Sequence, residues 1–362
     1  MTVYPLVSVC IPAYNAEKTI SATLDSILKQ DYPNFEVIVS DNQSTDNTRR
    51  IVQAYADQGV RYCLHTGERP DWAAGMPAHI GGFTNWDFVL SQGQGEFLCL
   101  YHADDLVQQG IIHKQANLMQ ANHRVGAVFT MAQMIGDDDL PIRLGRTQLP
   151  PELGDRQIFE FDELFNAILA HGNFLPAPSV MIRRSTLDVV GRFDEYHFQS
   201  SADLEMWLRI GRQYDIGIID EPLLNFRISN TQWGARYNKL RTTLADYFTV
   251  VDHYLVESEV RHTVTQGVLA FHEMERSADL VLCAMNLLAQ GHVNEAQVQL
   301  DSALQWRHFL TAFRRPRRLI RLLIGASFLI STWVGLGSIA GRGVYRAYQW
   351  DLQRRQKPIV RV

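Results

Sequence analysis

Residues 6–30 read LVSVCIPAYNAEKTISATLDSILKQ, an apolar run followed by a turn and an amphipathic segment. Pro12 ends the apolar run, because proline has no N–H to offer a neighbouring strand. Further apolar runs lie at 35–40, 60–64 and 96–101, with helix-like segments at 16–30 and 48–59 between them. Continuously apolar strands that alternate with helices are typical of parallel sheets buried on both faces. The pattern therefore predicts an α/β fold with a mostly parallel sheet covered by helices.

This alternation continues to about residue 236. Strands are expected at 125–135, 178–184 and 216–220, and helices at 161–172 and 204–214. From residue 237 to about 313 the chain reads as helical only. We therefore predict a catalytic domain over 1–236, a helical extension over 237–313 and a separate C-terminal segment over 314–362. In open α/β sheets ligands bind beyond the carboxyl ends of the strands, so polar residues directly after each strand are the candidates for function.

The composition of the 362-residue chain is that of an ordinary globular protein, with 46% hydrophobic residues and a net charge of -5. This balance gives no basic footprint for nucleic acid. The four cysteines form no C-x-x-C pair, and we expect them to be reduced, most of them buried. The N-terminus has neither a basic region nor a long apolar region, so no signal peptide is expected and the catalytic part should face the cytoplasm.

The C-terminal segment combines a basic run with an uncharged run. RRPRRLIR occupies 314–321, and the 19 residues of 322–340 carry no charge. About 20 apolar residues are needed to span a bilayer. Three structures remain open: one transmembrane helix, a hairpin or helix lying on anionic lipid, and a buried helix of the soluble part. Arginines on both sides of the run favour membrane association.

Two turns in the first third carry residues suited to a nucleotide. Tyr14 follows the first strand and offers a flat face for a base, while Asp41 ends the second strand and can accept hydrogen bonds from a base or a ribose. The alternative is structural, since Thr45 or Asp46 can cap the next helix. There is no G-x-G-x-x-G or P-loop pattern, so a diphosphate at this edge would need a metal as its charge partner.

The sequence YHADD, residues 101–105, follows the fourth strand. Two readings are open for Asp104 and Asp105. They can stabilise the N-terminus of the helix that LVQQGIIHKQANLMQ predicts, or they can hold a cation. Mg²⁺ and Mn²⁺ take carboxylate oxygens together with substrate phosphates, and the imidazole of His102 would tilt the choice toward Mn²⁺.

Four segments together resemble the family 2 glycosyltransferases, which are inverting nucleotide-sugar enzymes of the GT-A fold. They are VSVCIPAYNAEKTI, SDNQSTDNT, NWDFVLSQGQGEFLCLYHADD and ADLEMWLRI, in the family's order and spacing, and the resemblance covers residues 5 to 230. It implies a mixed, mostly parallel Rossmann-like sheet. In the family's D-x-D signature the last Asp coordinates the divalent cation, and Asp104 occupies that position. His102 stands where the family has the first Asp, which leaves the metal, Mn²⁺ or Mg²⁺, open.

The resemblance also implies which residues hold the donor nucleotide. They are Pro12, Ala13, Tyr14, Asn15, Asp41, Asn42, Asn85, Ala103 and Asp105. Asn85 and Trp86 resemble a turn of the family that lines the donor pocket, and Asp105 either touches the donor or caps a helix.

SSADLEMWLRIGR resembles the family's acceptor-site motif, with Ala202 in place of its Glu and Asp203 matching its Asp. An inverting transfer needs one base to take the acceptor's proton, and Asp203 is the candidate. The alternative is that Asp203 only caps this helix. Arg227 or Arg236 could offset charge on the leaving nucleotide.

These features predict an enzyme of the EC 2.4 class that moves a single sugar from a nucleoside-diphosphate sugar, with UDP weakly favoured, to a hydroxyl acceptor. A membrane-associated tail suggests a glycan or lipid-linked acceptor at the cytoplasmic face of the membrane, in envelope polysaccharide synthesis. Homo-oligomers stay open. A processive synthase is disfavoured because QWGARY replaces its Q-x-x-R-W, and a nucleotidyltransferase because a Gly- and Lys/Arg-rich N-terminal loop is missing. A catalytically silent nucleotide-sugar-binding or scaffolding module is the remaining alternative, kept open by His102 and Ala202.

Overall fold

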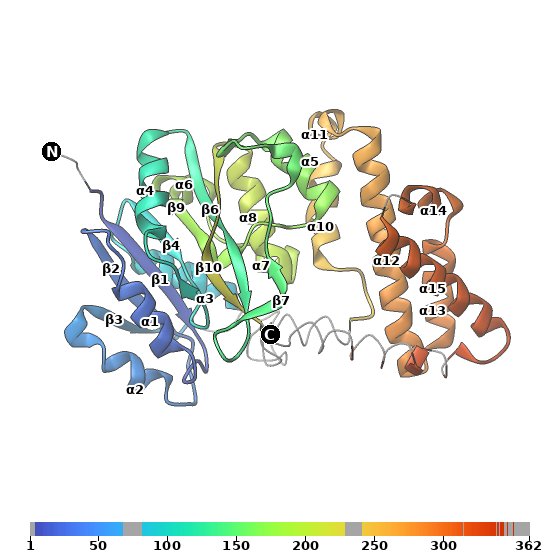
Figure 1. Cartoon of the computed structure of the whole chain (residues 1–362), viewed down its shortest axis with the longest axis horizontal. Coiled ribbons are helices and arrows are strands. Elements are labelled where there is room, and N and C mark those ends of the chain that lie inside the picture. The colour runs from blue at the N-terminus through green and yellow to red at the C-terminus, as the bar shows by residue number, and fades with distance from the viewer. Residues whose placement is uncertain are drawn as a thin grey trace, which may run out of the picture. The chain divides into compact units, whose positions relative to one another are not determined.

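The computed structural model describes residues 4–67, 82–228, 241–313 and 315–337, together with 339, 341–343, 346 and 350. The chain forms two compact units (Figure 1). The first comprises residues 1–164 and 173–228, and the second comprises 165–172 and 229–362. The predicted boundary at 236 lies outside the described residues, so the three-part division stays a prediction.

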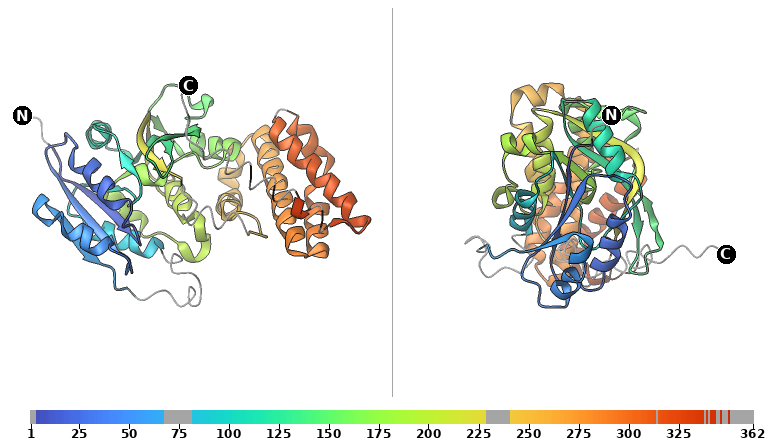
Figure 2. Two further views of the ribbon diagram at one scale, coloured as in Figure 1. Left: turned by 60° about the horizontal axis from the view of Figure 1, so that its bottom comes forward. Right: turned by 90° about the vertical axis from the view of Figure 1, so that its left-hand side faces the viewer.

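A single mixed sheet forms the centre of the first unit, with helices on both faces (Figure 2). Its strands run in the order β3 (Val60–Leu64), β2 (Phe35–Asp41), β1 (Val7–Ala13), β4 (Phe97–Leu100), β9 (Val180–Arg183), β6 (Val125–Ile135), β10 (Asp215–Arg227) and β5 (Leu106–Val107). Two further strands, β7 (Pro141–Arg146) and β8 (Ile158–Phe159), pair with β6 and β10. The predicted α/β fold class is confirmed.

The first half of the sheet explains where the polar turns meet. β1 pairs in parallel with both β2 and β4, and β2 pairs in parallel with β3. The carboxyl ends of these strands therefore lie at one edge of the sheet. Beyond β4 the sheet becomes mixed, because β9 runs antiparallel to β4 and to β6.

The helices of the first unit cover both faces of the sheet. They are α1 (Ile20–Leu28), α2 (Thr48–Gln53), α3 (Gly82–Gln92), α4 (Ile111–Ala121), α6 (Arg184–Val190), α7 (Glu195–Phe198), α8 (Ala202–Gly211) and the start of α5 (Phe161–His171). On one face, Val7 and Val9 of β1 join a core with Ile20 of α1 and Ile112 of α4. Alternate strand residues point to opposite faces, so Cys10 is buried on the other side. All four cysteines are free, as expected.

The second unit contains helices only among its described residues. They are α10 (Asp246–Leu255), α11 (Ser258–Thr263), α12 (Gln266–Gln290), α13 (Val293–Ala303), α14 (Trp306–Ala312) and α15 (Pro316–Trp333), with the end of α5. Its core includes Val281 and Leu288 of α12, Leu300 of α13 and Leu322 of α15. A buried ion pair, 2.7 Å long, joins Arg241, which precedes α10, to Asp279 of α12. The helical region predicted up to residue 313 thus continues into the basic and uncharged runs.

Two predictions about local structure are wrong, and one predicted strand is shorter than the observed one. Asp104 and Asp105 do not begin a helix, because β5 follows them directly and α4 begins only at Ile111, after Gly110 in a left-handed conformation. Asn85 and Trp86 lie within α3 rather than in a turn. The strand predicted at 216–220 extends to Arg227, since β10 pairs along its length with β6.

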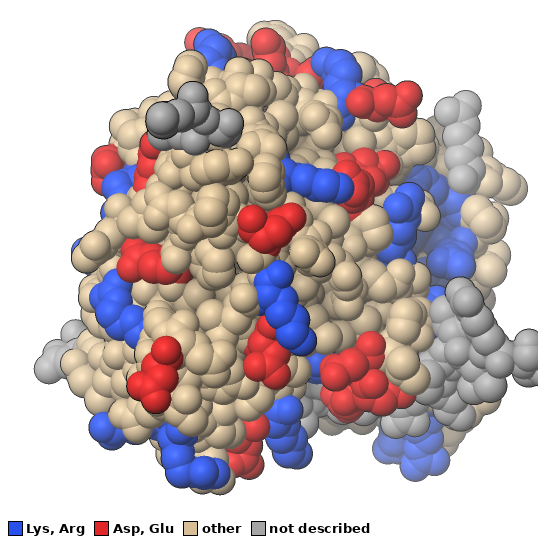
Figure 3. Space-filling model, turned by 60° about the vertical axis from the view of Figure 1, so that its left-hand side comes forward, with Lys and Arg blue, Asp and Glu red and all other residues tan. Residues whose placement is uncertain are grey.

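Two further observations concern the membrane prediction and the distribution of charge on the surface. In the described part of the chain, no helix combines the length and the apolar character needed to cross a bilayer. On the face drawn in Figure 3, acidic and basic side chains are interspersed rather than gathered by sign.

Candidate active site

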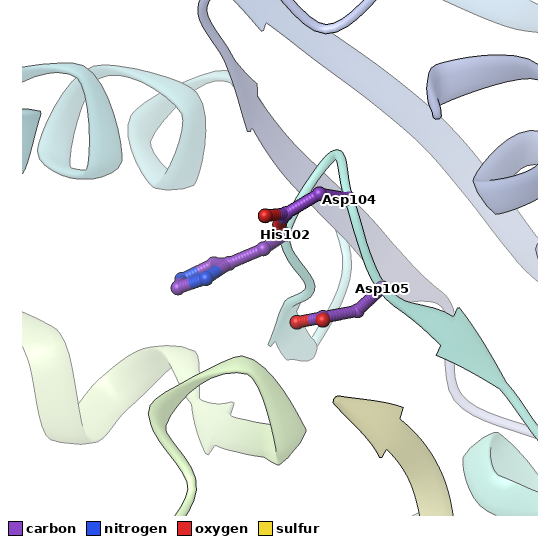
Figure 4. Close-up of side chains that lie close together, drawn as sticks. All are labelled: His102, Asp104 and Asp105. Carbon is purple, nitrogen blue, oxygen red and sulfur yellow. The ribbon is translucent and has the colours of Figure 1, made fainter. Parts of the chain in front are cut away.

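The turn between β4 and β5 brings His102, Asp104 and Asp105 together (Figure 4). One possible ligand atom from each of the three side chains lies within 4.8 Å of the other two. The turn is anchored to the first part of α1, because Thr19 and Thr23 donate hydrogen bonds to the carbonyl of Ala103 at 2.9 and 3.1 Å. Predicted donor residue Ala103 is thus buried, and its carbonyl is used for this attachment.

Asp105 is held by the far end of the sheet. The backbone N–H of Arg227, the last residue of β10, donates to Oδ1 of Asp105 at 2.8 Å. The Arg227 guanidinium, itself buried, donates to the carbonyls of Asp104 and Gly136 at 2.8 Å and pairs with Asp139. Arg227 therefore fastens the turn to β10, and its charge is already matched by an acid of this chain. The suggested alternative, Arg236, lies outside the described residues.

Two polar atoms of this turn are buried and have no hydrogen-bond partner among the described residues. They are Nε2 of His102 and Oδ2 of Asp105. Burial lowers the pKa of His102, against the opposing effect of the Asp104 carboxylate, so its imidazole is neutral and keeps a lone pair at neutral pH. Burial, and then the charge of Asp104, raise the pKa of Asp105 well above its usual range. A buried polar atom without a partner costs free energy, so this donor set suits a divalent cation.

The predicted nucleotide residues at the ends of β1 and β2 form a second cluster. Asp41 is buried, and its two oxygens accept hydrogen bonds from Ser44 N–H at 2.8 Å and from Tyr62 Oη at 2.9 Å. Burial, together with the Asp41 carboxylate, raises the pKa of Tyr62 to about 12, which keeps its hydroxyl protonated. Asp46 is not the N-cap of α2, because Asn47 occupies that position. The Asp46 carboxylate accepts hydrogen bonds from the N–H and hydroxyl of Thr48 and from the N–H of Glu17.

The same cluster ties β1 to β2 through short polar contacts. Asn42 donates its N–H to the carbonyl of Ala13 at 2.8 Å, and its side chain contacts His65. Asn15, with φ at +48°, accepts from Thr45 N–H at 2.8 Å. Pro12 is the penultimate residue of β1 and is half-buried, whereas Tyr14 is 40% exposed. Tyr14 is thus the residue of this edge most available for stacking.

Asn85 is buried on α3, and its amide group accepts from Ser40 Oγ and donates to the Ser40 carbonyl at 3.2 Å. Its side chain therefore attaches α3 to β2. The next residue, Trp86, stacks at a tilt on His102 with ring centroids 4.8 Å apart.

Aromatic rings connect the metal-binding candidates to α8. The Trp86 ring contacts Phe193 at 5.5 Å, and Phe193 contacts Trp207 at 5.7 Å. Asp203 lies one helical turn before Trp207. Phe193 could not have been found from the sequence, because it lies on a loop without a motif and its contacts are distant in the chain.

Asp203 is not the cap of α8, because Ser201 precedes the helix and Asp203 lies inside it. Its Oδ1 accepts the neighbouring Leu204 N–H at 2.7 Å. Burial raises the pKa of Asp203 to about 6. The helix is held in place by Arg209, which pairs with Glu205 at 2.8 Å and donates to the carbonyls of Val190 and Arg192. A carboxylate with this pKa is suited to accept a proton near neutral pH.

A family model described as glycosyl transferase family 2 matches residues 8–191. The chain belongs to glycosyltransferase family 2. This match spans the polar turns after β1, β2 and β4, and the predicted family is confirmed.

One relative of this glycosyltransferase is the UDP-Glc:α-D-GlcNAc-diphosphoundecaprenol β-1,3-glucosyltransferase WfgD of Escherichia coli. It is 36% identical over 236 residues, which cover 65% of this chain and 81% of the relative. Two solved structures share the fold. They are residues 1–349 of Staphylococcus aureus TarS with UDP-GlcNAc (TM-score 0.53, 20% identity, 95% of this chain and 92% of that chain) and the mannosyltransferase PcManGT of Pyrobaculum calidifontis with GDP-Man and Mn²⁺ (TM-score 0.55, 18% identity, 91% and 88%).

Proposed function

We propose that this glycosyltransferase moves one sugar from a UDP-sugar to an acceptor hydroxyl with inversion, and that it requires a divalent cation. The observation that carries the proposal is the convergence of His102, Asp104 and Asp105, with two buried atoms that have no partner among the described residues. A cation held by these three side chains would offset the negative charge that develops on the leaving diphosphate. The neutral imidazole of His102 favours Mn²⁺ over Mg²⁺.

In this proposal the donor nucleotide binds across the ends of β1 and β2. Tyr14 stacks on the base, and the backbone of Pro12, Ala13 and Asn15 lines the same edge. Asp41 and Asn42 position the base and ribose, with the Asp41 side chain oriented by the hydrogen bonds it accepts from Ser44 and Tyr62. The UDP-sugars in the printed names of WfgD and of the TarS complex support uridine as the base.

Asp203 acts as the base of the transfer. The acceptor oxygen forms a bond to the anomeric carbon while the bond to the diphosphate breaks, and the acceptor's proton moves to the Asp203 carboxylate. An α-linked donor gives a β-linked product. The raised pKa, about 6, makes Asp203 a stronger base than an exposed carboxylate while leaving it mostly ionised at pH 7.

The acceptor is proposed to be a lipid-linked glycan of the cell envelope, at the cytoplasmic face of the membrane. The diphosphoundecaprenol acceptor in the name of WfgD supports this assignment. The arginine-rich and uncharged runs at 314–340 support association with that membrane. We also propose that the chemistry is carried out by the catalytic domain over 1–236, and that the helical extension over 237–313 and the segment over 314–362 lie outside it.

Asp203→Asn tests the proposal against the silent-module alternative. With UDP-glucose, UDP-GlcNAc and GDP-mannose assayed with and without Mn²⁺, we expect wild-type transfer with a UDP-sugar and a loss of at least about 10³-fold in the variant. Nucleotide binding should be unchanged, because Asp203 contacts the acceptor. Undiminished transfer would remove Asp203 from its role, and the absence of nucleotide binding in every condition would overturn the enzyme proposal.

The pH profile tests the same base without a mutation. Because the active form of Asp203 is ionised, kcat/KM should fall by about tenfold per pH unit below about pH 6. A profile flat to pH 5 would show that no group with this pKa is needed as a base.

A further inference from the structure

Helix α15 is apolar on two opposite faces. One face packs into the second unit, where Leu322 and Phe328 are buried. Gly325 lies between them so close to α12 that a Cβ at this position would meet the Val281 side chain at 2.7 Å. Arg318 adds an ion pair with Glu275 of α12 at 2.7 Å. This face is therefore fixed to the protein.

The opposite face is open to solvent. Ile320, Leu323, Ile330 and Val334 are 56%, 54%, 58% and 64% exposed. At about 100° per residue Ile320, Leu323 and Ile330 fall within one narrow stripe of α15, directly opposite Leu322, Gly325 and Phe328, and Val334, the residue after the helix, continues it. We call them the α15 stripe. Helix α14 and the residue after it carry similar exposed apolar side chains, since Trp306, Leu310 and Phe313 are 75%, 59% and 69% exposed. Exposed apolar rows of this kind mark surfaces that bind a partner.

The charge around these stripes indicates the partner. Residues 302–350 contain no acidic residue and eight arginines, namely Arg307, Arg314, Arg315, Arg317, Arg318, Arg321, Arg342 and Arg346. The whole chain, by contrast, has a net charge of -5. A second copy of the chain would bring one arginine-rich surface against another, which is unfavourable. Anionic headgroups match this charge, and tryptophans such as Trp306 and Trp333 are enriched at the boundary between headgroups and acyl chains.

We propose that α15 lies in the plane of an anionic bilayer, with the α15 stripe inserted at the headgroup boundary while its other face stays packed on α12. This inference refines, and rests on, the membrane location proposed for the enzyme. It explains why the part of α15 from Leu322 to Trp333 is uncharged although the helix belongs to the helical unit: one side packs on α12 and the other side contacts lipid. The arrangement is that of an interfacial amphipathic helix with its apolar face buried in the headgroup layer.

Vesicle flotation with the full chain tests the surface directly. Wild-type protein should bind phosphatidylcholine vesicles containing about 30% phosphatidylglycerol at least about tenfold more tightly than pure phosphatidylcholine vesicles. The double variant L323E/I330E should lose at least about tenfold of this binding. V298E is the matched control, because Val298 is a 70% exposed apolar residue on α13 outside the stripe, and it should bind as wild type does.

A second variant keeps the test independent of folding. R317Q/R342Q leaves the stripe unchanged, alters only exposed side chains and should weaken binding to the anionic vesicles several-fold, more strongly at low salt. The proposal is overturned if L323E/I330E floats like wild type, if wild type ignores anionic vesicles, or if the stripe variants change only the oligomeric state measured by light scattering.

Activity on a water-soluble acceptor analogue separates this inference from the proposed function. L323E/I330E should transfer sugar to the soluble acceptor at the wild-type rate while its binding to anionic vesicles is lost. If the wild type fails to transfer any sugar but still binds vesicles through the stripe, the proposed function falls and the surface assignment stands.

Discussion

The turns after β2 and β4 differ in how their buried carboxylates are satisfied. Asp41, at the end of β2, has both oxygens paired with groups of the chain. Asp105, after β4, has one oxygen paired with the backbone of Arg227, whereas its other oxygen and Nε2 of His102 are buried without a hydrogen-bond partner among the described residues. A carboxylate that its own fold satisfies is preorganised to orient a ligand. A site whose buried polar atoms have no partner among the described residues is suited to a ligand that supplies charge, and this difference is why we propose the cation at the β4 turn and not at the β2 turn.

The largest effect should come from Asp104→Asn. This change removes a negative charge from the cation site while preserving the shape of the side chain, so we expect the metal-dependent kcat/KM to fall by at least about 10³-fold. Steady-state assays over a Mn²⁺ titration measure the loss. Asp57→Asn, an exposed acid near β3, is the control and should be indistinguishable from wild type. If Asp104→Asn lowers kcat/KM by less than about tenfold, the proposed difference between the two turns is contradicted.

Arg227→Met should come next, because Arg227 positions the β4 turn without binding the cation. Its loss frees the carbonyls of Asp104 and Gly136, and we expect Mn²⁺ affinity to fall by about 10- to 100-fold. If Arg227 only positions the turn, saturating Mn²⁺ should restore most of kcat. Arg124→Gln, which breaks an ion pair whose arginine is 78% exposed, should leave both parameters unchanged. A variant whose Mn²⁺ affinity stays at the wild-type value would show that Arg227 serves stability alone.

Asp41→Ala probes the satisfied turn and should give a smaller effect of another kind. Tyr62 Oη and Ser44 N–H would lose their acceptor, so the free energy of unfolding should drop by about 1–3 kcal/mol. The KM for the donor should rise by about tenfold, while the Mn²⁺ requirement should stay as it is. Urea unfolding and donor titrations measure the two changes. A change in Mn²⁺ affinity as large as that of Asp104→Asn would remove the distinction between the turns.

His102→Asp should give the smallest effect, since it restores the acidic residue of the D-x-D signature. A carboxylate is a harder ligand than imidazole, so the ratio of Mg²⁺- to Mn²⁺-supported activity should rise by up to about tenfold. His123→Asp, on an exposed histidine after α4, is the control. An unchanged ratio would indicate that His102 does not touch the cation.

The fold was predictable from the sequence where its signals are local. Apolar runs located the first four strands, and Gly172, with φ at +81°, ends α5 as the sequence predicted. The residues of YHADD could also be placed at a strand exit, because they come directly at the end of the apolar run at 96–101. What failed was the helix after Asp105, since β5 exists only through its pairing with Leu224 and Asn225 of β10.

The sequence predicted which side chains form the site, but it did not predict which residues hold them in place. The motif indicated His102, Asp104 and Asp105, yet nothing in the sequence connects Asp105 to Arg227, which lies 122 residues away. The contact between Trp86 and His102 and the pairing of Asp41 with Tyr62 are likewise tertiary. The two faces of α15 are hidden from the sequence for the same reason, because an apolar run does not say which side another helix covers.

Direct measurement of Mn²⁺ binding tests the central claim, that the β4 turn and not the β2 turn holds the cation. Electron paramagnetic resonance of free Mn²⁺, titrated with the full chain in the presence of UDP, should show one bound ion per chain in the wild type and in Asp41→Asn. Binding should be lost in Asp104→Asn. Equal binding by the wild type and Asp104→Asn, or loss of binding only in Asp41→Asn, would contradict the account.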